Sequence, residues 1–182
     1  MTESASRRIG GNISRRTHLC AMAFMLTLTG LGTGVAYSMD ADLGARPELL
    51  PGNSASVYQF GQKNSTAVQQ QGASNTAWFG QSGSDNAINA TQQGHGNLGT
   101  LTQAGAENMI SLAQYDKTNY AAAAQNGYAN NASVAQYNTF GDARIAQDGN
   151  LNSAAVITLS AGAPPVKINQ YGNGAFAKVI QY

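Results

Sequence analysis

Charged residues are scarce in this chain. They make up 10% of its 182 residues, with 10 Lys and Arg against 9 Asp and Glu. Nucleic-acid binding calls for a basic face, which this composition does not provide. Catalysis calls for convergent ionisable groups, and we find no such clustering in the sequence. From residue 53 onward the positive and negative charges balance, and a net charge near zero promotes association.

Cysteine is nearly absent as well. The only one, Cys20, lies in an N-terminal segment that we expect to be removed. The mature chain would then have no thiol, which excludes disulfides and thiol chemistry. The apolar run 19–31 is short and diluted by Thr and Gly, whereas a membrane span needs about 20 apolar residues.

The first 36 residues have the layout of an export signal. A positively charged region precedes the apolar run, and Gly34-Val35-Ala36 offers small residues for cleavage, which would leave Tyr37 first. The positive charges are Arg7, Arg8, Arg15 and Arg16. We therefore predict an export signal peptide at 1–36. Residues 37–52 have no repeat character and are predicted to form a flexible N-terminal segment.

An eleven-residue repeat fills the remainder, 53–182. Residues 70–81 show the unit, Gln-x-Gly-x-x-Asn-x-Ala-x-Φ-x-Gln, where Φ is apolar and the last Gln opens the next copy. Internal repetition of this kind governs the choice of fold. The eleven-residue spacing of Gln places Thr158 where a Gln is expected. After one extra residue the spacing continues at Gln170 and Gln181.

Each unit contains a segment in which alternate residues share a character. This period of two is typical of a β-strand. The inward-facing set carries no charge, while the outward set carries Asp142, Arg144, Lys167 and Lys178, and this contrast fixes the register. The twelve predicted strands are 53–59, 64–70, 75–81, 86–92, 97–103, 108–114, 119–125, 130–136, 141–147, 152–158, 164–170 and 175–181.

Four-residue corners separate these strands. Most carry Gly at the second position, where a positive φ is needed. The two-residue Asn-Gly loops that hairpins favour are absent. We therefore predict an all-β fold, a two-sheet β-solenoid of six 22-residue turns. It would be roughly 29 Å long at about 4.8 Å per rung.

Amide side chains replace much of the ordinary apolar core. Buried amides are costly unless they are hydrogen-bonded, and identical amides stacked at strand spacing can bond from rung to rung. The predicted core amides are Gln59, Asn64, Gln70, Asn75, Gln81, Asn86, Gln92, Asn97, Gln103, Asn108, Gln114, Asn119, Gln125, Asn130, Gln136, Gln147, Asn152, Gln170 and Gln181.

The first and last strands are each predicted to have an outer edge whose backbone groups are unpaired and unprotected. Natural proteins usually protect such edges with charge, Pro or a covering element, and an unprotected edge can template another chain. The alternative is that residues 37–52 cover the first edge in a monomer. The predicted assembly-edge residues are Val57, Tyr58, Phe176, Val179, Ile180 and Tyr182.

A row of these units behind an export signal resembles the curlins, the subunits of bacterial curli. The resemblance covers about 53–182. It implies an extracellular amyloid fibre of stacked β-solenoid subunits, used for surface adhesion and biofilm matrix. It also implies partners: other curlin subunits, a secretion pore with accessory factors at the outer membrane, and host or abiotic surfaces.

The family has a major, shaft-forming subunit and a minor, nucleating one. The nearly uniform eleven-residue unit, the Asn that opens most strands and the decayed final turn favour the minor type. Gln181-Tyr182 at the end, and the lack of basic residues there, favour the major type. We predict the nucleator, with the shaft subunit as the alternative.

Three other classes are weighed against this interpretation. An enzyme on a β-helix needs ionisable residues on one face, and none gather there. A monomeric surface-binding module needs a regular outward Thr array, which only Thr100 and Thr102 approach. Asp85 and Glu107, stacked beside Lys63, offer too few oxygens for calcium. We predict no enzyme activity, no cofactor and no metal.

Overall fold

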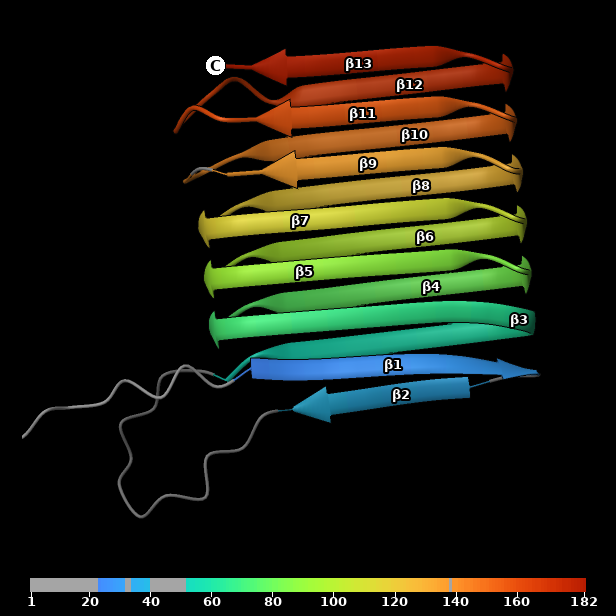
Figure 1. Ribbon diagram of the computed structural model, residues 1–182, viewed down its shortest axis with the longest axis horizontal. Helices are drawn as coiled ribbons and strands as arrows, with labels where there is room; N and C mark the ends of the chain where they lie inside the picture. The colour runs from blue at the N-terminus through green and yellow to red at the C-terminus, as the bar shows by residue number, and fades with distance from the viewer. Residues whose placement is uncertain (1–22, 32–33, 40–51, 138) are drawn as a thin grey trace, which may run out of the picture.

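The computed structural model describes residues 23–31, 34–39, 52–137 and 139–182, and all of its regular elements are strands (Figure 1). Among these residues there is no helix long and apolar enough to cross a bilayer. The repeat region contains β3 Ser54–Ala73, β4 Thr76–Ser84, β5 Ala87–His95, β6 Leu98–Ala106, β7 Met109–Lys117, β8 Tyr120–Tyr128, β9 Asn131–Gln136, β10 Asp142–Asn150, β11 Ser153–Thr158, β12 Val166–Asn173 and β13 Phe176–Gln181.

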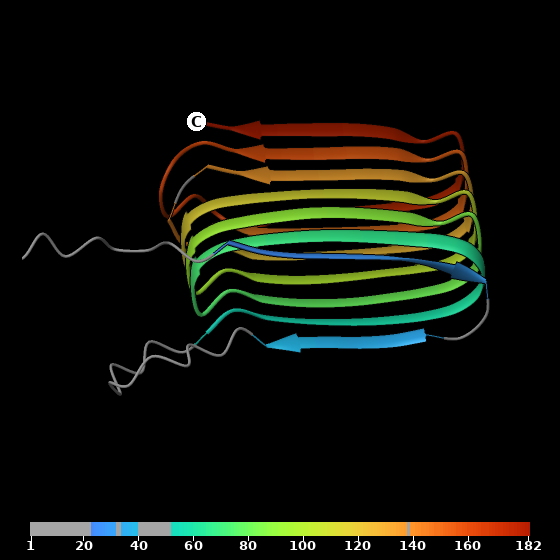
Figure 2. The ribbon, with the colours of Figure 1, turned by 60° about the horizontal axis from the view of Figure 1, so that its bottom comes forward.

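These strands wind into a solenoid. β4, β6, β8, β10 and β12 stack in parallel on the first half of β3, and β5, β7, β9, β11 and β13 stack on its second half. The two stacks form two layers joined at the corners (Figure 2). Gln59 pairs with Gln81 and Gln70 with Gln92, a shift of 22 residues per turn. The predicted β-solenoid of about six turns is confirmed.

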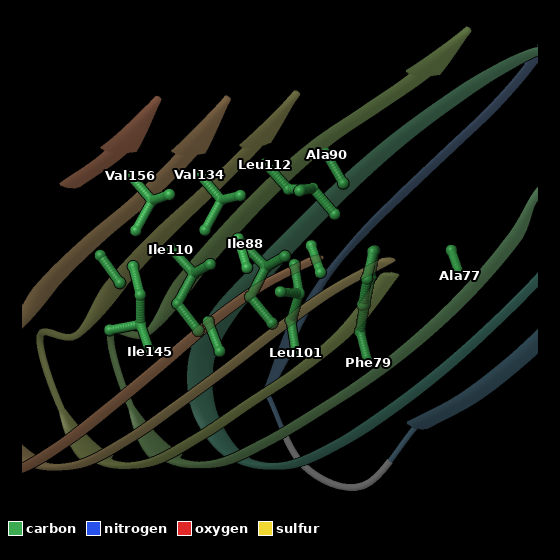
Figure 3. Packing of buried hydrophobic residues seen from close by; sticks show 14 of the residues in the cluster. Ala77, Phe79, Ile88, Ala90, Leu101, Ile110, Leu112, Val134, Ile145 and Val156 are labelled. Carbon is green, nitrogen blue, oxygen red and sulfur yellow. The ribbon is translucent and has the colours of Figure 1, made fainter. Parts of the chain in front are cut away.

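A thin apolar core lies between the layers. Alternate residues of each strand are buried, as the period of two requires. Phe79 and Leu101 come from one layer, Ile88 and Ile110 from the other, and they meet at the centre (Figure 3). Alanines fill the places beside them, which keeps the layers close.

The observed strands differ in extent from the predicted ones. Most begin one residue after the Asn and run about three residues past the Gln, because corner backbones also pair from turn to turn, as Gly61 does with Gly83. β3 runs through its corner without a break. β12 begins at Val166 rather than at 164, because Pro164 and Pro165 occupy its predicted start and have no N–H to donate.

Two further strands cover the first turn. β1 Ala23–Leu31 and β2 Gly34–Met39 pair antiparallel with β3, with Phe24 opposite Gln70 and Ala36 opposite Val57. Both lie within the predicted export signal and the start of the predicted flexible segment. The rest of those segments (1–22, 32–33 and 40–51) lies outside the described residues. The boundaries at 36 and 52 stay predictions.

Candidate assembly surfaces: the amide ladders and the ends of the solenoid

Glutamine side chains form a ladder in each layer, with Thr158 in one of the Gln places. The Nε2 of most of these Gln residues donates to the Oε1 of the Gln one turn later: from Gln81 to Gln103 over 2.8 Å, and from Gln92 to Gln114 over 2.8 Å. The same Nε2 also donates to a backbone oxygen of the facing strand, as Gln81 does to Ser65 O. Where both bonds form, both N–H groups of the amide are used, which offsets the cost of burial.

Asparagine side chains hold the corners. The backbone N–H of Asn97 donates to Asn75 Oδ1 over 3.1 Å, and Asn97 Nδ2 donates to the same oxygen. The Nδ2 groups also donate to corner carbonyls, as Asn75 does to Gly94 O. One Asn thus links two turns and fixes the start of each strand.

All of the predicted core amides are buried except Gln181, which is half-buried in the last turn. Thr158 takes the Gln place in one turn, and its hydroxyl donates to Gln181 Oε1 over 3.3 Å. Gly141 and Ala175 take Asn places and still donate their backbone N–H to the Asn of the preceding turn. The ladders therefore tolerate these three substitutions inside the molecule.

Glycine in the corner is required by space as well as by conformation. Gly127 has a φ of +122°, and a Cβ there would lie 2.0 Å from Gly149 O in the next turn. Gly61, Gly83, Gly105 and Gly149 are equally close to the turn that follows them. Gly172 also has a positive φ, but no atom of the described residues lies within 4 Å of its missing Cβ, and β12 is the outermost strand of its layer.

The first turn is covered at its outer edge. Val57 is fully buried, whereas Tyr58 on the outer face is half exposed. The covering elements are β1 and β2, so the predicted bare edge is paired in this structure, and by residues 23–31 and 34–39 rather than by 37–52 alone. Gln70 Oε1 is nevertheless buried without a hydrogen-bond partner among the described residues. It is the acceptor that begins the Gln ladder.

The last turn is uncovered at its outer edge. β12 and β13 end the order of strands in the described part of the chain (Figure 1). Val179 is only partly buried because no turn packs on its far side, and Ala177 is in the same position. The predicted edge residues Phe176, Ile180 and Tyr182 are exposed, with 74%, 40% and 87% of their surfaces accessible.

Two corner contacts join neighbouring turns on the surface. The Tyr115 and Tyr137 rings stack with centroids 5.0 Å apart and planes 5° from parallel. Tyr128 Oη donates to Glu107 Oε2 over 2.9 Å, and this hydrogen bond, with the carboxylate charge, raises the pKa of Tyr128. No cluster of three or more His, Cys, Asp or Glu that could hold a metal ion occurs among the described residues.

The sequence did not indicate a second left-handed position in each corner. The residue before most Asn places also has a positive φ, even where it is Glu107 (57°), Phe140 (63°) or Leu151 (58°). No residue type marks this place, so periodicity alone could have located it. Asp116 takes the Gly place of one corner, and its backbone is also left-handed, with a φ of 74°.

A comparison with protein families identifies the repeat. Residues 63–94 and 83–115 each match the model of the Curlin associated repeat, a structural, non-enzymatic family. The matched part is less than half of the chain. No curated protein and no solved structure matches the chain.

Proposed function

We propose that this chain is an extracellular structural protein, a subunit of curli-type amyloid fibres that assembles by stacking one solenoid on the end of another. The observation that carries the proposal is the parallel, in-register pairing of every turn, which stops at the unpaired outer edge of β12 and β13. An edge of this kind is a template for a further turn. The curlin-associated repeats at 63–115 support the same function.

Removal of the export signal would open the other end. Cleavage after Ala36 would take away β1 and the first three residues of β2, which pair with the outer edge of β3. The exported chain would then have an edge to offer at both ends. On this proposal the precursor is protected during export and the processed chain is competent to assemble.

Among curlin subunits, we propose the minor, nucleating type. The eleven-residue unit is nearly uniform and Asn opens most strands, while the last turn departs from the repeat at Pro164 and Ala175. The alternative is a shaft-forming subunit. The proposed partners are other copies, other curlin subunits, the secretion pore with its accessory factors, and host or abiotic surfaces, in an adhesive biofilm matrix.

Seeding distinguishes these functions. The exported chain is collected from the medium, its N-terminal residue is read, and thioflavin fluorescence is followed over time. It is followed for the chain alone, and with the chain as a small seed for a shaft curlin from the same source. We expect self-assembly and loss of the shaft subunit's lag. Seeding of its own monomer only would indicate a shaft subunit, and a stable soluble monomer in both assays would contradict the fibre function.

A further inference from the structure

We call the position that opens each repeat strand, where Asn usually stands, the Asn place. A hydrogen bond joins each Asn place to the equivalent place one turn later. The acceptor is the side-chain Oδ1, and the donor is the backbone N–H one turn later, as in Asn75 N–H to Asn53 Oδ1 over 3.0 Å and Asn86 N–H to Asn64 Oδ1 over 3.2 Å. Both partners are buried, so the loss of either one leaves a polar group without compensation. The rule can be followed turn by turn along both layers.

Inside the molecule the exceptions match one another. Gly141 has no side-chain acceptor for the turn that follows it. The residue at that place in the next turn is Pro164, which has no N–H to donate. In the other layer the ladder is unbroken to its end, where Ala175 N–H donates to Asn152 Oδ1 over 2.9 Å. After the first turn, therefore, every Asn-place N–H among the described residues has its Oδ1 acceptor.

The last turn breaks the rule for any turn placed on it. Its two Asn places are Pro164 and Ala175, and neither has a side-chain oxygen. An identical copy stacked in register would bring the N–H groups of Asn53 and Asn64 to these places, where no acceptor exists. Pro165 removes a further bond, because the residue after each Asn place normally donates to the turn above, as Ser54 N–H does to Asn75 O.

The glutamine places remain intact at the same edge. Gln170 Nε2 donates to Ser153 O and Gln181 Nε2 to Pro164 O, and each amide keeps a second N–H for a following turn. At the other end, Gln70 Oε1 is a buried acceptor without a partner. The first turn carries the complete set of Asn53, Gln59, Asn64 and Gln70. The two ends are therefore unequal, with one complete and one lacking both Asn side chains.

We propose that the first turn, residues 53–70, is built to stack on a different chain, one with the same eleven-residue amide repeat and with Asn at both places of its last turn. The last turn, residues 164–181, restricts the stacking of identical copies. This inference rests on the proposed fibre function and adds the kind of partner and the polarity of the junction. On this proposal the first turn of the nucleating subunit pairs more stably with another subunit than with the last turn of an identical copy.

A single substitution restores one missing acceptor. Ala175→Asn supplies an Oδ1 for the Asn64 N–H of an incoming copy, while its own N–H keeps the bond to Asn152. Gly174→Asn is the matched control. It adds the same amide one residue earlier, in the corner, where the φ is 69° and no atom of the described residues lies within 4 Å of the added Cβ. Asn tolerates that left-handed geometry.

The exported wild-type, A175N and G174N chains are each assembled from their own monomer, and the residual monomer concentration at equilibrium is measured, so that the altered junction recurs along each fibre. A buried hydrogen bond of typical strength corresponds to about a tenfold change in affinity, so we expect A175N to leave about one tenth of the wild-type residual concentration and G174N to match wild type.

Equal residual concentrations for A175N and wild type would overturn the inference while leaving the fibre function intact. An equal gain from G174N would also overturn it, because any added amide would then suffice. Failure of all three chains to assemble would contradict the fibre function itself, together with the inference.

Discussion

Glutamine and asparagine fill much of the core of this protein, as leucine does in an ordinary core. Unlike leucine, they also form hydrogen bonds that run in one direction along the stack of turns. A buried Gln in the ladder donates to the turn that follows and accepts from the turn before, as Gln92 and Gln114 do. An apolar side chain would fill the space without specifying which residue lies above it. The amides therefore fix the register between turns, since a slip would leave buried donors and acceptors unpaired.

Replacement of one ladder amide by an apolar side chain of similar length tests this role. Gln114→Met leaves an N–H of Gln92 and the Oε1 of Gln136 without partners inside the core. We expect the free energy of unfolding to fall by about 3 kcal/mol, from two buried polar groups left unsatisfied. Guanidinium titration followed by the fluorescence of Trp78, the only tryptophan, measures it.

Gln93→Met is the control for that substitution. It makes the same chemical change one turn earlier in the same layer, at an exposed side chain on the outer face of β5. We expect a change within about 0.5 kcal/mol, as is usual at the surface. A similar loss in both variants would show that the ladder has no special role in stability.

At the scale of the strand and corner, the sequence predicted which face is buried but not where pairing stops. The period of two placed Val57, Phe79 and Gln81 inward, because uncharged residues occupy every alternate place. The pairing of corner backbones could not be read from side chains, since it depends on the close approach of successive turns at Gly61 and Gly83. The pairing of β1 with β3 was also missed, because 23–31 does not share the repeat.

The contact between Tyr128 and Glu107 joins two neighbouring corners and gives a prediction about pH. The hydrogen bond from Tyr128 Oη to the carboxylate, the carboxylate charge and slight burial raise the pKa of Tyr128 above its ordinary value of 10.0. A raised pKa means that the contact stabilises the protonated phenol. Its contribution is present below pH 10 and is lost as the pH rises through the pKa of the folded chain.

Absorbance titration of the tyrosines checks this. We expect the difference between wild type and Tyr128→Phe to show one phenol that ionises above pH 10. Glu107→Gln removes the charge and should return that phenol toward its ordinary pKa. An unchanged titration in Glu107→Gln would exclude Glu107 as the cause of the shift.

At the scale of the whole molecule, the repeat in the sequence predicted the architecture, but it did not predict how the two ends of the solenoid differ. Eleven-residue spacing gave the turn length and the two layers because each Gln and Asn must lie over its equivalent one turn away. The place of Pro164 and Ala175 in the last turn was visible as decay of the repeat. Its meaning required the geometry, which shows that the Asn oxygen serves the next turn rather than its own.

The stacking of single solenoids predicts how much mass a fibre carries per unit length. Six turns at strand spacing rise about 29 Å, so a chain of 18.9 kDa, or its exported part, gives about 0.5 to 0.65 kDa per Å. Pairing of two solenoids through the outer face of β10 and β12 would bury Asp142, Arg144 and Lys167, which is costly. We therefore expect the single value in mass measurements by scanning transmission electron microscopy, and strands perpendicular to the fibre axis in diffraction. A doubled mass per length would show that the fibre unit is a lateral pair, and the end surfaces would then no longer suffice to explain assembly.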